Sequence, residues 1–269
     1  MVAAPEEALE RVSARVSELA TTYEPPGFAE VPNPDAALFC AAIDHSSGYR
    51  APHLVEGEGP YEGSALLWAR ALAFERRRPG LLSARSLVDV SEHELRTLLT
   101  VEGDEVSEPG ERARLWRDAA EVLIEDYDGW AVELIASAEG NLGGPGGALA
   151  RLAAIEAYSD PLAKKSFLVC KIWARRGWLQ VADPESWEVC ADNVLMRLAL
   201  RSGLVAEGGV EDVRAATRAA FKAVSERAEI TPPLLDDLLW ERGRKDPDLL
   251  GSAAGELTEP PRRAGVHFY

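Results

Sequence analysis

Residues 161–205 read PLAKKSFLVCKIWARRGWLQVADPESWEVCADNVLMRLALRSGLV and contain two apolar helical runs joined by a polar loop. Lys164 and Lys165 open the first run, which ends at Trp173. Asp192 precedes the second run, and aspartate is a favoured residue for capping the N-terminus of a helix. The stretch therefore predicts two buried helices, with a basic pair at the start of one and a carboxylate at the start of the other.

Helical patterns recur along the rest of the chain, where apolar residues are spaced three and four apart. We expect Ser64 to cap one of these helices, and Ser91 with Glu94 to form a capping box at another. No run of alternating β-branched residues stands out, so we predict a mostly α globule with few or no strands. Outside the opening stretch, the predicted helices lie at 5–23, 35–44, 65–76, 111–127, 130–138, 149–158, 210–227 and 234–240.

The predicted helices suggest one helical domain over residues 1–245, with two lobes and a cleft between them as the alternative arrangement. The tail at 246–269 is rich in proline and glycine and is expected to be largely irregular. The glycine-rich stretch 140–147, GNLGGPGG, lacks the Lys-Ser/Thr ending of a phosphate-binding loop and has no strand before it. We interpret it as a flexible connection between helices.

The net charge of −16 disfavours binding to bare duplex DNA, because nonspecific affinity for DNA comes from lysine and arginine neutralising phosphates. No apolar run reaches membrane length, and the acidic, amphipathic N-terminus is unlike a signal peptide. The three cysteines are widely spaced in apolar runs, which is typical of core thiols in a reducing compartment. We therefore predict a cytoplasmic protein without a membrane partner, and the oligomeric state stays open.

The sequence has no CxxC, HExxH or EF-hand spacing, and it has neither a Walker motif nor the glycine pattern of a dinucleotide-binding turn. These absences predict a protein that uses neither a metal nor a cofactor. Any chemistry would then rest on carboxylates, lysines and aromatic side chains.

A polar cluster that begins with Asp44 and His45 follows the predicted helix at 35–44. Such a cluster is either a helix end with a turn or a group of substrate-facing side chains, since functional groups favour loops on rigid scaffolds. Asp128 is likewise either a turn residue or a ligand contact. Trp130 and Trp187 are suited to core packing, or to stacking on a flat base.

A series of short motifs occurs along the chain in this order: Leu67-Trp68-Ala69, SEHEL at 91–95, Glu111-Arg112, Tyr127-Asp128-Gly129, Lys164-Lys165 with Trp173, and Cys190-Ala191-Asp192. In these motifs and their order the chain resembles the queuosine salvage proteins, which are nucleoside hydrolases related in fold to helix-hairpin-helix DNA glycosylases. The chain departs from the family's pattern at Asn193 and Val194, where the family has Tyr-Arg, and this suggests a divergent branch.

The resemblance implies a glycosylase-like fold and hydrolysis of the N-glycosidic bond in a queuosine-type nucleoside or its 5′-monophosphate. Asp192 is then the candidate catalytic carboxylate, although its residue type and position equally suit a helix cap. Lys164 or Lys165 could form a Schiff base with the opened sugar, bind a 5′-phosphate or pair with Asp192. The candidate substrate contacts are Asp44, His45, Asp128, Trp130, Trp187 and Asn193.

Two alternatives remain open at this point. The first is a DNA glycosylase/lyase that flips a damaged base out of the duplex. The second is a catalytically inactive helical protein that binds a nucleobase. The chain has no convincing copy of the LxGVGxKTA-like hairpin with which such glycosylases grip DNA, and this favours a small nucleoside over duplex DNA.

Overall fold

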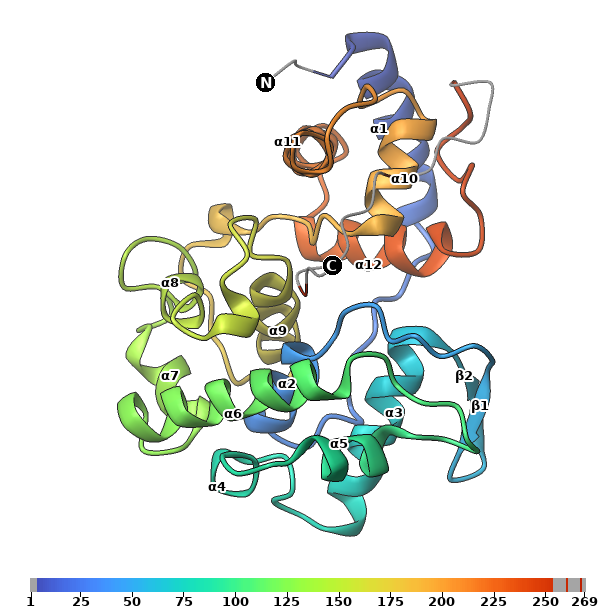
Figure 1. The fold of residues 1–269 in the computed structure, drawn as a ribbon. Coiled ribbons are helices and arrows are strands. Elements are labelled where there is room, and N and C mark those ends of the chain that lie inside the picture. Colours follow the sequence, from blue (N-terminus) through green and yellow to red (C-terminus); the bar gives the residue numbers. More distant parts are fainter. Residues whose placement is uncertain (1–3, 254–259, 261–266, 268–269) are drawn as a thin grey trace. The chain divides into compact units, whose positions relative to one another are not determined.

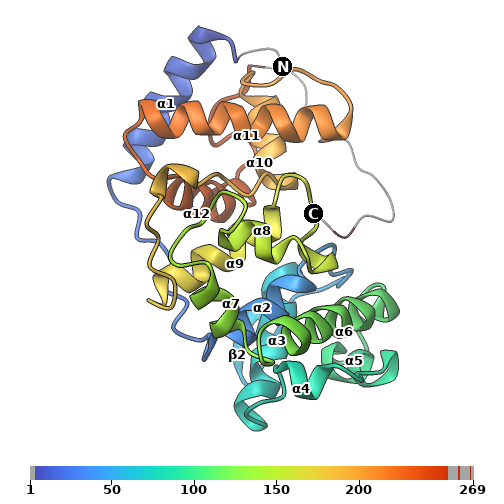
Figure 2. The ribbon, with the colours of Figure 1, turned by 90° about the vertical axis from the view of Figure 1, so that its left-hand side faces the viewer.

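The computed structural model describes residues 4–253, 260 and 267, and these fall into two compact units (Figure 1, Figure 2). Unit 1 combines the N-terminal segment up to residue 26 with residues 185–266, and unit 2 comprises residues 27–184 with the C-terminal residues 267–269. Helices dominate both units, and the strands found in the described residues form a single two-stranded sheet. This confirms the prediction of a mostly α fold.

Unit 2 is built around one short helix, α2 (Pro34–Ala42). The helices α3, α6, α7 and α9 all pack against it (Figure 1). The sheet pairs β1 (His53–Val55) antiparallel with β2 (Glu58–Tyr61) and packs on α3. The remaining elements are α3 (Gly63–Arg77), α4 (Ala84–Leu87), α5 (Glu92–Leu99), α6 (Pro109–Asp126), α7 (Ala131–Ser137), α8 (Ala148–Leu152), the 3₁₀ turn η1 (Glu156–Tyr158) and α9 (Lys164–Arg175).

The sequence of α2 explains both its start and its central place. The Asn33 side chain accepts a hydrogen bond from the Ala36 amide at 2.8 Å, and Pro34 occupies the first helical position, where its missing N–H costs nothing. Its apolar residues and those just beyond it are fully buried. The helix therefore carries Asp44 and His45, which follow it directly, into the interior of unit 2.

Helix α9 runs antiparallel to α2. Near its C-terminal end, the Trp173 indole donates to the Pro34 carbonyl at the start of α2, at 3.1 Å. At its N-terminal end, the Lys165 amine donates to the Ala42 carbonyl at the end of α2, at 2.6 Å. Trp173 and Lys165 thus tie α9 to α2 at both ends of the helix pair. This packing places the two lysines beside the residues that follow α2.

In its described residues, unit 1 has four helices: α1 packs on α11 and α12, and α10 packs on the same two helices (Figure 2). Helix α1 buries an apolar face, on which Val12 and Val16 are fully buried. A 3₁₀ turn, η2 (Pro184–Ser186), precedes α10 along the chain. The four helices are α1 (Glu6–Ala20), α10 (Asn193–Arg201), α11 (Val210–Arg227) and α12 (Pro232–Gly243).

Two local predictions are corrected by the structure. Ser64 does not cap α3, which begins one residue earlier; its hydroxyl instead donates to the Asp44 carboxylate at 2.6 Å. The helix predicted at 149–158 is two shorter elements: α8 ends at Leu152, and after a turn the 3₁₀ helix η1 follows. The capping box of Ser91 and Glu94 is confirmed.

Other expectations concern the cysteines, membrane crossing and the tail. The three cysteines are buried, as expected of core thiols. Among the described residues, no helix combines the length and apolar character needed to cross a membrane. The tail predicted to be irregular has neither helix nor strand at 246–253, 260 and 267, and the rest of it lies outside the described residues.

The glycine-rich stretch connects α7 to α8, as predicted, and it wraps a carboxylate of the chain itself. The amides of Leu142 and Gly143 donate to the two carboxylate oxygens of Asp183 at 2.6 and 2.8 Å. The amide donors that suggested a phosphate loop are therefore engaged by Asp183.

Replacing Gly147 by alanine should destabilise unit 2 by about 1–3 kcal/mol, since overpacking against rigid atoms costs this much. A Cβ at Gly147 would lie 2.1 Å from the Gly143 carbonyl oxygen, which is backbone and cannot swing away. Gly146→Ala is the control, because its Cβ would meet nothing within 4 Å. Urea unfolding followed by circular dichroism compares the two; equal stability would contradict the expectation.

Candidate functional site

The lysine pair at the start of α9 meets the polar cluster at the end of α2. The Lys165 Nζ lies 3.2 Å from the His45 Nδ1, and the Lys164 Nζ donates to the Asp44 carbonyl at 3.3 Å. These residues were singled out separately in the sequence, and the antiparallel packing of α2 and α9 brings them together. We call Asp44, His45, Lys164 and Lys165 the lysine–histidine cluster.

The cluster is deeply buried, which is uncommon for lysine. Lys165 is 0% exposed and Lys164 is 8% exposed, so only Lys164 retains some contact with the surface. Burial, together with the charge of Lys164, lowers the pKa of Lys165 well below its usual range. Burial, followed by the charges of Lys165 and Arg112, lowers the pKa of His45 and keeps its imidazole neutral. Buried groups with shifted pKa values are candidates for functional sites.

The carboxylate of Asp44 is held in one position by α3. It accepts a hydrogen bond from the Ser64 hydroxyl at 2.6 Å and another from the Trp68 indole at 3.2 Å. These two hydrogen bonds fix the orientation of the Asp44 carboxylate, since a hydrogen bond to an ionised acceptor is stronger than one between neutral groups. The motif at 67–69 therefore contributes a positioning side chain to the cluster.

Arg112 on α6 braces the segment that carries the cluster. Its guanidinium donates to the carbonyls of Ile43, His45 and Ser46, the last two at 2.8 and 3.0 Å. It also donates to the Ser107 carbonyl at 2.7 Å. Burial lowers the pKa of Arg112 to about 10, so it remains charged at neutral pH. The Glu111-Arg112 motif thus fixes the backbone on which His45 is mounted.

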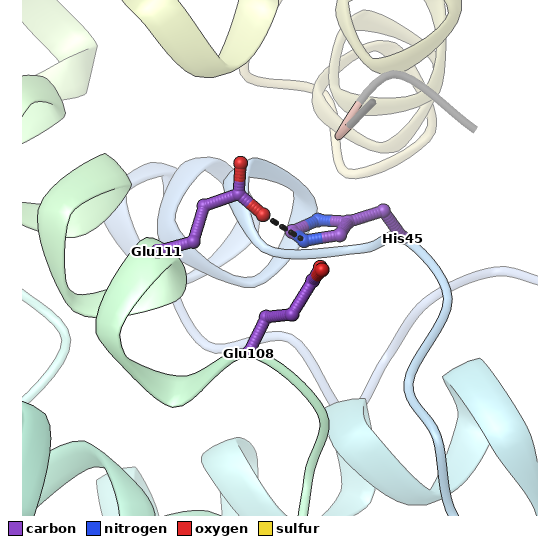
Figure 3. Close-up of side chains that lie close together, drawn as sticks. All are labelled: His45, Glu108 and Glu111. Carbon is purple, nitrogen blue, oxygen red and sulfur yellow. Dashed lines mark ion pairs between the residues drawn. The ribbon is translucent and has the colours of Figure 1, made fainter. Parts of the chain in front are cut away.

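Two glutamates on the opposite side of His45 complete the surroundings (Figure 3). The Glu111 carboxylate in the first turn of α6 lies 3.6 Å from the His45 Nε2. Glu108 precedes α6 in the left-handed backbone region, with φ of 49°. One ligand atom from each of His45, Glu108 and Glu111 lies within 4.8 Å of the others. No sequence pattern predicts this group, because His45 lies far along the chain from the two glutamates.

The candidate residues of unit 1 are placed around the start of α10. The Asp192 carboxylate accepts hydrogen bonds from the amides of Val194 and Leu195 at 2.9 and 3.0 Å, which confirms the helix cap. Asn193 occupies the first position of α10, and its side-chain oxygen is buried without a hydrogen-bond partner. Trp187 is largely buried. The catalytic role of Asp192 stays a prediction, since these hydrogen bonds are those of a helix cap.

Asp128 and Trp130 lie in the turn before α7, away from the lysine–histidine cluster. The neighbouring amide, of Ala131, donates to the Asp35 carboxylate in the first turn of α2 at 2.7 Å, whereas His45 follows the other end. The nine residues of α2 span about 13 Å at the usual helical rise. Trp130 is 44% exposed, with the Arg85 guanidinium 6.0 Å from its ring. The structure therefore does not bring this pair to the cluster.

The sequence matches no known protein-family model, and no curated protein is significantly similar to it. Support for a family thus comes from the order of the short motifs alone. The geometry of the lysine–histidine cluster is the structural observation that bears on function.

Proposed function

We propose that the protein is an N-glycosidase that releases a purine-like base, of the queuine type, from a nucleoside or its 5′-monophosphate. The observation that carries the proposal is the meeting of Lys164 and Lys165 with Asp44 and His45 inside unit 2. Buried cations are costly to a fold, and such arrangements are more frequent at functional sites than elsewhere. The motif resemblance supplies the reaction class.

The chemistry requires one bond to form and one to break at the anomeric carbon. A water oxygen adds to C1′, the bond from C1′ to the base nitrogen breaks with its electron pair going to the base, and a proton follows to that nitrogen. Positive charge builds on the sugar as the bond breaks, as in the hydrolysis of O-glycosides. A fixed carboxylate near that carbon lowers the barrier, and in this proposal Asp192 has that role.

The two lysines have different parts in this proposal. We assign the contact with a sugar or its 5′-phosphate to Lys164, because it keeps some surface exposure. Lys165 is bonded to the Ala42 carbonyl and lies against His45, so it positions the imidazole. Asp44 contributes a fixed hydrogen-bonding group for the substrate.

The direct test is to incubate the purified protein with queuosine, its 5′-monophosphate and the common nucleosides, and to follow free base by chromatography. We expect a free base from at least one modified purine nucleoside. The absence of any base release across the set would rule the proposal out.

Replacing Lys164 by methionine should lower kcat/KM for base release by about 10²-fold or more, the range for loss of a positioned acid, base or cation. Methionine keeps the length of the buried stem, so packing is largely preserved. The control is Lys222→Met, on the partly exposed surface of α11, where the lysine pairs with Glu188 at 3.5 Å. If both variants retained full activity, Lys164 would have no part in the reaction.

A further inference from the structure

We propose that His45, Glu108 and Glu111 form a binding site for a divalent transition-metal ion of the zinc class. Figure 3 shows the two carboxylates directed at the imidazole from the start of α6. Their ligand atoms all lie within 4.8 Å of one another. Histidine nitrogen and carboxylate oxygen are both ligand types that zinc sites use.

The His45 Nε2 is the observation that sets this group apart from an ordinary acidic surface cluster. His45 is 4% exposed, and its Nε2 has no hydrogen-bond partner. The nearest carboxylate oxygen, on Glu111, is 3.6 Å away, too far for a hydrogen bond. Buried polar atoms are nearly always satisfied, and a bound ion between the nitrogen and the carboxylates would satisfy this one.

The other ring nitrogen of His45 lies against a lysine. Its Nδ1 is 3.2 Å from the Lys165 Nζ, which already donates to the Ala42 carbonyl. With this edge of the ring held by Lys165, the opposite edge presents Nε2 to the glutamates. Histidines that bind metals commonly have their second ring nitrogen fixed by a hydrogen bond.

Charge and geometry both suit a divalent ion. The two glutamates carry two negative charges, and Asp44 offsets part of the nearby positive charge of Arg112 and Lys164. Ligands around a common zinc ion lie roughly 3–4 Å apart, since each bond is about 2 Å long. The Glu108 side chain is exposed and can move inward to close the remaining distance. Because Glu108 lies at the surface, a water molecule can take a further coordination position.

His267 lies on the other oxygen of Glu111. Its Nδ1 is 3.5 Å from the Glu111 Oε1, and its Nε2 lies 3.2 Å from the Glu156 carbonyl oxygen. Two imidazoles therefore flank Glu111, one on each carboxylate oxygen.

The test is titration of the full-length, chelator-treated protein with Zn²⁺ by calorimetry, without nucleoside. We expect one Zn²⁺ per chain and much weaker binding of Mg²⁺, because a nitrogen donor favours zinc. Glu108→Gln and Glu111→Gln should each weaken Zn²⁺ binding by at least about tenfold. Glu121→Gln, an exposed position on the same helix, is the matched control and should bind as tightly as the parent.

No Zn²⁺ binding, or equal affinity in all three variants, would overturn the metal site. Both glutamates lie at least partly at the surface, and circular dichroism of each variant verifies that it is folded. The result is separate from the proposed glycosidase activity, since binding is measured without substrate and base release can be measured in the presence of chelator.

Discussion

Replacing Asp192 by asparagine should lower the rate of base release by about 10²–10³-fold, the usual effect of removing one fixed electrostatic group from a transition state. Asparagine caps a helix as well as aspartate does, so the bonds to the Val194 and Leu195 amides can persist. The substitution therefore removes the charge while α10 keeps its start. Steady-state release of free base from the best nucleoside is the measurement.

Two further variants separate the charge of Asp192 from its cap. Asp192→Ala loses both and should also destabilise unit 1 by about 1 kcal/mol, the typical cost of a lost cap. Asp212→Asn removes a charge from the exposed first turn of α11 and should leave activity unchanged. Full turnover in Asp192→Asn would show that Asp192 is a structural cap only.

Replacing Arg112 by methionine should destabilise unit 2 by about 3–5 kcal/mol, because it leaves several buried acceptors without donors. The guanidinium serves the carbonyls of Ile43, His45 and Ser46 from a side chain that is fully buried. Methionine fills much of the volume but donates no hydrogen bond. Urea unfolding by circular dichroism measures the change.

Arg114→Met is the matched control, two residues further along α6. Arg114 pairs with Glu156 at the surface, where ion pairs contribute only about 0–1 kcal/mol. If the two variants were equally stable, the bracing role of Arg112 would be wrong. A loss confined to Arg112→Met would show that the backbone carrying His45 depends on this one side chain.

The sequence by itself determined most of the helices and several of their starts, because these depend on neighbours a few residues apart. The caps at Ser91 and Asp192 are confirmed for this reason, since each side chain accepts a hydrogen bond from an amide three residues later. The predicted cap at Ser64 was wrong because a distant residue competes for its hydroxyl. A serine before an apolar run suits a cap, but its hydroxyl found a stronger, charged acceptor in Asp44.

Only the tertiary structure decided which side chains meet. The contact between Lys165 and His45 joins residues 120 positions apart, and it exists because α9 packs antiparallel on α2. The same packing sets the burial that makes Lys165 a weak base. Glu108 and Glu111 reach His45 through α6 and have no local motif that predicts it. Periodicity shows which face of a helix is buried, whereas the partner on that face is set by the packing of all the helices at once.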